Sequence, residues 1–426
     1  MIVWLSTIGQ RLDHADNTRT MLLARYLIER GHDVTLWTSA FDHIRKQWRT
    51  EMADAVDGCW TMPHGLKVRF MQGCGYRRNI GVRRLYDHVL AARDFRRQAE
   101  ALTRPDIVVA SLPDHVTAAA MVDFARDHGI HSLIDVRDKW PDIFHDYAPA
   151  PLKPLVRSAL MFESRRARGA MRQATALVAM MNSMLDWGLA KAGRAGTAKD
   201  RIFYLSTMES ATPETAPLTD LGEEHRAIIA DAAGKMVFTF IGTYNRTQHP
   251  LLVIEAFERL AQDSAFDADR VRLLIGGDGV DADAVDRRIA ALPFARKLGW
   301  LKPPEMRAIL TRSDVGLLPM NFPSPAFNNK AFAYLACGIP ILNGALGDLA
   351  ELIAEQEVGV NVPAGDPAAL AATVKAFARD RDRVTAMQAK VRDLYAASFD
   401  QDRTYGDYVA HVEAIAGGWK ADQPSG

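Results

Sequence analysis

A single lysine in the second half of the chain occupies a helical position where its charge is unfavourable in the absence of an anion. Lys330 lies in the first turn of a helix that we expect over residues 329–337, and Asn328 is a good N-cap for it. A cation there opposes the helix dipole by about 0.3–1 kcal/mol, whereas the free N–H groups of the turn suit a phosphate. The pattern predicts that Lys330, Asn328 and Asn329 bind a diphosphate. The alternative is that Lys330 simply reaches solvent.

Two glycine-containing loops follow apolar runs earlier in the same half. Gly242 ends one such run and precedes Arg246, whose guanidinium could pair with phosphate. The second loop, residues 276–279, contains Gly277 and Asp278 and lacks the full G-x-G-x-x-G fingerprint of dinucleotide sites. We predict that these four residues contact a nucleotide donor. Each loop taken alone could also be a plain tight turn.

Polar residues likewise follow the apolar runs of the first half. The loop over residues 7–17 is dense in polar groups, and similar loops follow residues 107–110 and 132–136. Charge beside an aromatic ring suits a sugar, so we predict an acceptor site here made of Gly9, Asn17, His115, Arg137 and Trp140. His115 could instead be a cap or surface residue, and Arg137 could form a structural ion pair with Asp138.

Transfer of a group to a hydroxyl needs a base or charged partners for the leaving group. On the acceptor side we predict Asp138 and His14 in this role. Lys330 is the third predicted catalytic residue, because its charge could stabilise a departing diphosphate.

Short apolar runs alternate with helical periodicity through most of the chain, which predicts βαβ units and parallel sheets. In the first half we expect a helix over residues 18–30 and strands over 1–6, 32–37, 107–110, 132–136 and, as the last, 177–180. In the second half we expect strands over 237–241, 271–275, 315–318 and 339–342, and helices over 251–260 and 304–312. The segment from residue 207 is rich in Pro, Ser and Thr, which is typical of a linker.

The predicted fold class is therefore α/β, with two doubly wound domains. We expect an acceptor-binding domain over residues 1–206, a linker over 207–234 and a donor domain over 235–400. Residues 401–426 are expected to form a helix that packs back on the first domain, and a tail. A ligand would lie in a cleft between the two domains, at the carboxyl ends of the strands.

Residues 238–347 resemble the donor domain of family-4 glycosyltransferases. That domain has a strand ending in Gly, a Gly-Gly-x-Gly turn and a P-x-K-x-x-E-Y-L-A-x-G-x-P helix. Residues 31–43 and 135–142 resemble a bacterial branch of the same family. The resemblance implies the GT-B fold, two Rossmann-like domains facing a cleft. It also implies transfer of a sugar from a nucleotide-sugar to a saccharide or lipid-linked acceptor, with retention of configuration and without a metal, in surface polysaccharide or glycoconjugate assembly.

The chain departs from the family pattern at the donor site. Aligned on Lys330, the usual Glu-x7-Glu pair falls on Pro325 and Ala333, so both carboxylates are absent. The Arg and Lys that usually meet the diphosphate fall on Thr243 and Gln248. A hydrogen bond to a charged group is worth roughly 1.5–3 kcal/mol, so donor binding would be weaker.

Composition excludes several classes of partner. The 426 residues include 52 Lys and Arg against 52 Asp and Glu, a balance that argues against nucleic acid as the main partner. Cys59, Cys74 and Cys337 form no C-x-x-C pair, so neither a disulfide framework nor a zinc site is indicated. We expect no metal, and no cofactor beyond the nucleotide-sugar substrate.

The sequence predicts a cytoplasmic protein. The apolar start is too short for a signal peptide, and no apolar run approaches the roughly 20 residues of a membrane span. Residues 76–85 and 153–172 mix cations with apolar side chains, which would suit the inner face of an anionic membrane. The alternative is a solvated helix face.

Two other functions compete with sugar transfer. A nucleotide-sugar epimerase of the same fold would turn over without an acceptor. A non-catalytic homologue that binds a saccharide or a partner would fit the loss of both carboxylates, and it would show no donor binding.

Overall fold

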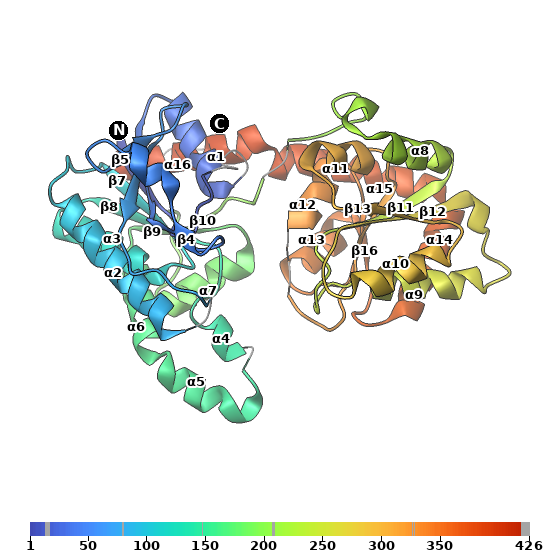
Figure 1. Ribbon diagram of the computed structural model, residues 1–426, viewed down its shortest axis with the longest axis horizontal. Coiled ribbons are helices and arrows are strands. Elements are labelled where there is room, and N and C mark those ends of the chain that lie inside the picture. The colour runs from blue at the N-terminus through green and yellow to red at the C-terminus, as the bar shows by residue number, and fades with distance from the viewer. Residues whose placement is uncertain are drawn as a thin grey trace. The chain divides into compact units, whose positions relative to one another are not determined.

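The computed structural model describes residues 1–12, 18–78, 81–146, 148–206, 209–325, 327 and 329–418. The chain divides into two compact units (Figure 1). The first unit is Met1–Tyr204 together with the segment from Asp402, and the second unit is Leu205–Gln401.

The first unit is built on an eight-stranded sheet with the order β10-β9-β8-β7-β1-β2-β6-β5. All neighbours are parallel except β5, which is antiparallel to β6. The strands are β1 (Ile2–Ser6), β2 (Asp33–Ser39), β5 (Cys59–Thr61), β6 (Lys67–Met71), β7 (Ile107–Ser111), β8 (His131–Val136), β9 (Ala176–Ala179) and β10 (Arg201–Ile202), with a separate hairpin of β3 (Phe41–Asp42) and β4 (Gln47–Trp48) after β2. The strand order reverses between β1 and β7, where a doubly wound sheet opens a crevice at its carboxyl edge.

Helices cover both faces of this sheet, so side chains along β1 alternate between two cores. Val3 and Leu5 pack into one core together with α1 and α16, whereas Trp4 packs into the other beside Trp37 and Phe124. The helices are α1 (Arg19–Glu29), α2 (Val82–Ala99), α3 (His115–Asp127), α4 (Ile143–Asp146), α5 (Lys153–Ala159), α6 (Met161–Gln173), α7 (Asn182–Ala192) and α16 (Gln401–Ala416), with shorter helical turns at Thr50–Asp54 and Ala150–Leu152.

The second unit is a fully parallel six-stranded sheet with the order β13-β12-β11-β14-β15-β16. Its strands are β11 (Met236–Ile241), β12 (Val271–Gly276), β13 (Ala295–Gly299), β14 (Val315–Leu318), β15 (Ile341–Asn343) and β16 (Gly359–Asn361). Its helices are α8 (Glu223–Ala232), α9 (Pro250–Ala261), α10 (Ala282–Ala290), α11 (Pro303–Leu310), α12 (Asn329–Ala336), α13 (Asp348–Gln356), α14 (Pro367–Arg379) and α15 (Arg381–Leu394), with short turns at Leu218–Asp220, Ala268–Arg270 and Tyr395–Phe399. Here the order reverses between β11 and β14.

The predicted α/β class with two doubly wound, Rossmann-like sheets is confirmed. The prediction that residues 177–180 form the last strand of the first half is wrong, because β10 follows and extends the sheet beside β9. Residues 223–232, expected within the linker, form α8 and belong to the second unit. Tyr405, Tyr408 and Val409 of α16 lie in the same core as Val3 and Leu5 of the first unit.

A buried ion triad fixes the end of β8. The carboxylate of Asp135 lies 2.9 Å from Nε of Arg19 and 2.7 Å from a terminal nitrogen of Arg137. Arg19 also donates to the carbonyl oxygens of Phe203 and Tyr204. Burial favours the neutral acid, but Arg137 and Arg19 hold the pKa of Asp135 below its ordinary value. The triad therefore connects α1, β8 and the segment at Phe203 and Tyr204.

Candidate functional site

The loops after β11 and β12 meet at the carboxyl edge of the second sheet. The N–H of Tyr244 donates to the carbonyl of Asp278 over 2.8 Å, and the N–H of Val280 donates to Tyr244 over 3.1 Å. His249 caps α9 by accepting from the N–H of Leu251, and its other ring nitrogen lies 2.8 Å from the carbonyl of Val280. These hydrogen bonds join the loop after β11 to the loop after β12, beside the point where the strand order reverses.

The backbones of these two loops lie so close together that some positions admit only glycine. Gly277 has φ +130°, and a Cβ there would lie 1.9 Å from the carbonyl oxygen of Gly242. Gly279 has φ +144°, and its Cβ would lie 2.4 Å from the oxygen of Tyr244. Asp278 turns its carboxylate onto the N–H of Gly279, 2.7 Å away. The structure thus gives the turn a packing role, and donor contacts of Gly277 and Asp278 stay a prediction.

Lys330 carries a buried amine at this edge. Its Nζ lies 4.2 Å from the ring centroid of Phe240, and no described residue forms a hydrogen bond with it. Gly242 leaves room for the side chain, because a Cβ there would lie 2.9 Å from Nζ. Burial lowers the pKa of Lys330 from 10.5 to about 7. A lone buried ammonium is costly, and an anion beside it would remove that cost.

Tyr334 holds α12, and with it Lys330, against the sheet. Its buried hydroxyl accepts from the N–H of Ile241 over 3.2 Å and lies 3.2 and 3.1 Å from the carbonyl oxygens of Thr239 and Leu317. A Cβ on Gly316 would lie 2.6 Å from the Tyr334 ring, so only glycine allows this contact. Since Tyr334 comes one helical turn after Lys330, the two side chains lie on the same face of α12.

The loop that carries Arg246 is fastened to the loop after β14. The side chain of Asn321 donates to the carbonyl of Arg246 over 2.9 Å, and its N–H donates to Thr247 over 2.9 Å. The Arg246 side chain itself is exposed. Gln248, which takes the place of the family lysine, is buried against Met320. Of the two cations expected to meet a diphosphate, Lys330 is thus buried at the sheet edge and Arg246 is on the surface.

The positions of the absent carboxylates are filled differently. Ala333 is buried on α12. Pro325 is exposed and pairs through its backbone with Leu346, in the loop after β15. Asn329 begins α12 and is exposed, whereas Asn328 lies outside the described residues.

Arg137 and Asp138, both predicted on the acceptor side, do not pair with each other. Arg137 pairs with Asp135 and donates to the hydroxyl of Thr20 over 2.8 Å, so it is part of the buried triad rather than a partner of Asp138. Asp138 accepts from the N–H of Lys139 over 2.7 Å, and burial raises its pKa. A raised pKa makes a carboxylate a stronger base than an ordinary aspartate.

His115 is engaged within the helical layer. It begins α3, is buried, and its Nε2 lies 2.6 Å from the carboxylate of Glu163 on α6. The neighbouring Asp114 caps α3 by accepting from Thr117. His115 therefore joins α3 to α6, which matches the capping and packing alternative more closely than a sugar contact.

Gly9 lies beside His43 and Trp140 lies beside Arg84, two residues that were not predicted as part of an acceptor site. A Cβ on Gly9 would lie 3.4 Å from the ring of His43. Trp140 is flanked by Phe144, at 4.6 Å between ring centroids, and by the guanidinium of Arg84, 4.9 Å from its ring. His14 and Asn17 lie outside the described residues. The only sequence signal for Arg84 was the basic stretch over residues 76–85.

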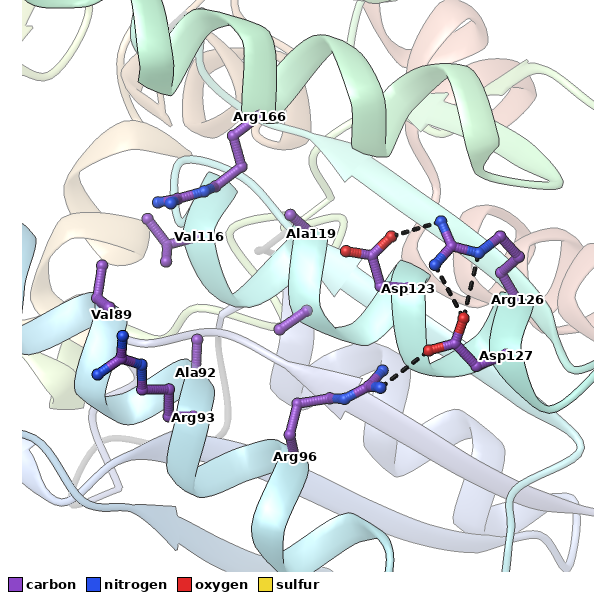
Figure 2. A pocket seen from close by; sticks show the side chains of 11 residues that line it. Val89, Ala92, Arg93, Arg96, Val116, Ala119, Asp123, Arg126, Asp127 and Arg166 are labelled. Carbon is purple, nitrogen blue, oxygen red and sulfur yellow. Dashed lines mark hydrogen bonds and ion pairs between the residues drawn. The ribbon is translucent and has the colours of Figure 1, made fainter.

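A groove between α2 and α3 contains none of the predicted site residues (Figure 2). Its floor is made of small apolar side chains such as Ala92, Val116 and Ala119. Along its rim Arg96 and Arg126 pair with aspartates of α3, as Figure 2 shows. The aspartates already neutralise the charges of these two arginines, so we do not place an anion site in the groove between the two helices.

Among the residues that the structure describes, no group of three or more His, Cys, Asp or Glu side chains could hold a metal ion. None of the helices in that part of the chain is both long and apolar enough to cross a membrane.

Two family profiles match the chain. The profile described as Glycosyl transferase 4-like domain matches residues 17–196, and the profile described as Glycosyl transferases group 1 matches residues 235–380. Solved structures share the fold along nearly the whole chain. HepE of Anabaena in complex with UDP is 13% identical with a TM-score of 0.66, covering 97% of this chain and 99% of that chain. Sucrose-phosphate synthase of Thermosynechococcus elongatus is 15% identical with a TM-score of 0.65, covering 97% and 98%.

Curated relatives match over shorter stretches. D-inositol 3-phosphate glycosyltransferase of Geodermatophilus obscurus is 28% identical over 193 residues, 43% of this chain and 42% of the relative. Glycogen synthase of Mycobacterium tuberculosis is 29% identical over 131 residues, 30% of this chain and 31% of the relative. The matched region thus spans less than half the length of either relative.

Replacing the buried amine should stabilise the ligand-free protein. We predict that Lys330→Met raises the melting temperature by at least ~2 °C, because an uncompensated buried charge gives way to an apolar chain of similar length. The pKa of Lys330 is lower in the folded chain, so the gain should be full below about pH 7 and shrink as the pH rises toward about 10. Differential scanning calorimetry at several pH values measures both effects.

Lys297→Met is the matched control, because Lys297 is exposed and pairs with Asp286. It should give no such gain. A lower melting temperature for Lys330→Met, with the control unchanged, would show that Lys330 is already compensated in the free protein.

Proposed function

Because the chain belongs to the family-4 glycosyltransferases, whose fold is GT-B, we propose that it transfers a sugar from a nucleotide-sugar donor to a saccharide or lipid-linked acceptor. The donor's diphosphate binds the second unit at the carboxyl edge of its sheet. The acceptor binds the corresponding edge of the first unit.

The observation that carries this proposal is the buried, unpartnered amine of Lys330 beside the Gly242 loop. A diphosphate there would accept hydrogen bonds from the ammonium of Lys330, from the N–H groups at the start of α12 and from the exposed guanidinium of Arg246. The same charges would stabilise the leaving diphosphate in the transition state, because its negative charge grows as the glycosidic bond breaks.

UDP is the first nucleotide to test. HepE of Anabaena was solved with UDP and with UDP-glucose, and it shares the fold over almost the whole chain. The names of the curated relatives mention D-inositol 3-phosphate and glycogen, which are therefore compounds to test in acceptor assays. Assembly of a surface polysaccharide, retention of configuration and metal independence remain parts of the proposal that rest on the family resemblance.

On the acceptor side, Asp138 is the described candidate for the polar partner of the reacting hydroxyl. Its raised pKa and its position after β8 support this role. His14 remains a candidate by sequence.

A non-catalytic homologue is the second candidate function, and one observation favours it. Ala333 and Pro325 leave the donor ribose without the carboxylate that the family supplies. Turnover of a nucleotide-sugar in the absence of any acceptor would instead identify an epimerase.

Donor binding is the direct test. We predict that calorimetric titration with UDP and UDP-sugars gives saturable binding, and that Lys330→Ala weakens it at least tenfold, about 1.4 kcal/mol. Lys297→Ala, which removes an exposed lysine of the same unit, should bind as the wild type does. If Lys330→Ala keeps full affinity while remaining folded, the donor site has been placed wrongly. If no nucleotide-sugar binds the wild type, the non-catalytic function is favoured.

The first unit also offers a surface suited to an anionic membrane. Leu155 of α5 and Phe162 of α6 are 68% and 69% exposed, among exposed cations that include Arg157 and Arg165. Figure 1 shows α5 at the margin of the first unit. Exposed apolar side chains with surrounding arginines favour binding at a lipid interface, which would bring a lipid-linked acceptor to the enzyme.

Co-sedimentation with phosphatidylglycerol vesicles tests this surface. We predict binding that falls several-fold in the double variant Leu155→Ser, Phe162→Ser. Val56→Ser, which removes another exposed apolar side chain of the first unit, is the control and should bind normally. Equal binding of both variants, or none by the wild type, would contradict a membrane role.

A further inference from the structure

Three buried polar atoms lie where α1 meets α16 in the first unit. They are Nη2 of Arg19 on α1 and the hydroxyl oxygens of Tyr405 and Tyr408 on α16. All three residues are buried, and none of the three atoms has a hydrogen-bond partner among the described residues. A buried polar atom without a partner costs free energy, so such atoms are usually bonded to an ordered water or an ion. We call these residues the arginine–tyrosine group.

Ring contacts bring the side chains of this group together. The guanidinium carbon of Arg19 lies 5.1 Å from the ring centroid of Tyr408. Tyr408 stacks on Phe203 at 4.5 Å between centroids, and the carbonyl of Phe203 accepts a hydrogen bond from Nη1 of Arg19. Tyr405 lies one turn before Tyr408 on the same face of α16, and it stacks on Tyr26 of α1 at 5.6 Å. The three side chains thus share one interface.

Both hydroxyls lie within the electrostatic influence of the ion triad at the end of β8. Burial raises the pKa of Tyr405 to about 12, although the positive charges of Arg19 and Arg137 oppose that shift. Burial and then the negative charge of Asp135 raise the pKa of Tyr408, and the same two arginines oppose the shift. Both hydroxyls therefore keep their protons at neutral pH and can donate hydrogen bonds.

The charges of the triad leave Arg19 in excess. One buried carboxylate, that of Asp135, pairs with the two guanidinium groups of Arg19 and Arg137. The side chain of Arg137 is 18% exposed and that of Arg19 only 2%, so water can screen Arg137 but not Arg19. A negative ion beside Nη2 of Arg19 would offset the remaining positive charge.

A small monovalent anion fits this group better than water does. Nη2 of Arg19 carries two N–H bonds and each tyrosine carries one O–H bond, so all three atoms can donate. A buried water typically makes about three hydrogen bonds, but it would leave the positive charge in place. An ion such as chloride accepts from every one of these donors and neutralises the charge as well.

We propose that a chloride ion binds between Nη2 of Arg19 and the hydroxyls of Tyr405 and Tyr408. The ion joins α16 to α1 and so holds α16 against the rest of the first unit. The inference does not depend on the proposed transferase function, because it concerns how a helix is held and not what the chain transfers.

Thermal unfolding in sodium chloride and in sodium gluconate, at equal ionic strength, tests the site. Gluconate is the reference anion, because it is too large for a buried site of this kind. The wild type should melt at least ~2 °C higher in about 200 mM chloride, because an ion that binds only the folded chain stabilises it.

The double variant Tyr405→Phe, Tyr408→Phe should lose this difference between the two salts, since it lacks both hydroxyl donors. In gluconate it should melt no lower than the wild type, because there the two hydroxyls have no partner to lose. Tyr86→Phe is the matched control, because Tyr86 is an exposed tyrosine of α2 in the same unit. The control should keep the full difference.

Crystals of the wild type grown with sodium bromide give a second measurement that needs no variant. Bromide replaces chloride, and its anomalous scattering locates it. A peak is expected within hydrogen-bond distance of Nη2 of Arg19.

Several results would overturn the proposal. Equal melting temperatures of the wild type in the two salts would show that chloride does not hold α16. A salt difference that persists in the double variant would show that the ion binds elsewhere. A water at Nη2 of Arg19 in the bromide crystals would show that water satisfies these donors. A bromide peak without any chloride-dependent stability would mean an adventitious ion only.

Discussion

A buried amine without a counter-ion is the constraint around which the second unit is arranged. Lys330 can occupy its place only because Gly242 has no side chain, and Phe240 supplies a ring face instead of an anion. Tyr334 fixes α12 to β11 and β14 through buried hydrogen bonds, so the helix that carries Lys330 is held at the sheet edge. The unit thus keeps an unfavourable charge at the point where its strand order reverses. An anion bound there would remove the cost of that charge, which would favour anion binding.

The first unit solves a related problem by the opposite means. Asp135 is buried but surrounded by Arg19 and Arg137, so its charge is fully compensated within the protein. This triad is structural, and it positions the loop after β8 from which Asp138 and Trp140 emerge. Around Tyr76 the balance is different: burial and the nearby Lys46 and Arg84 lower the pKa of His43, and burial and Arg84 lower the pKa of Lys46. Compensated charge marks the scaffold of the first unit, whereas the unpartnered amine of Lys330 marks the edge where we place the donor.

Much of the fold could be predicted from the sequence because its central strands are apolar runs bounded by glycine and polar loops. β6 was missed because lysine and arginine alternate with its apolar residues, and β10 and β16 because they are very short. The place of Lys330 in the first turn of α12 could be predicted because helix caps are local signals, and its role at a donor site stays a prediction. The role of Arg137 could not be predicted, because it depends on contacts with Asp135 and with the distant Thr20. Near-neighbour patterns reveal helix ends, whereas charge balance needs the tertiary structure.

The central claim is that a nucleotide diphosphate neutralises the buried amine of Lys330, and proton uptake on binding tests it most directly. The pKa of Lys330 is about 7 in the free protein, and a bound diphosphate would raise it, so affinity should fall as the pH rises above that value. Calorimetric titration with UDP at about pH 8, in buffers of different ionisation enthalpy, measures the protons taken up. The account predicts uptake of nearly one proton per nucleotide in the wild type. Binding of UDP without proton uptake would contradict it.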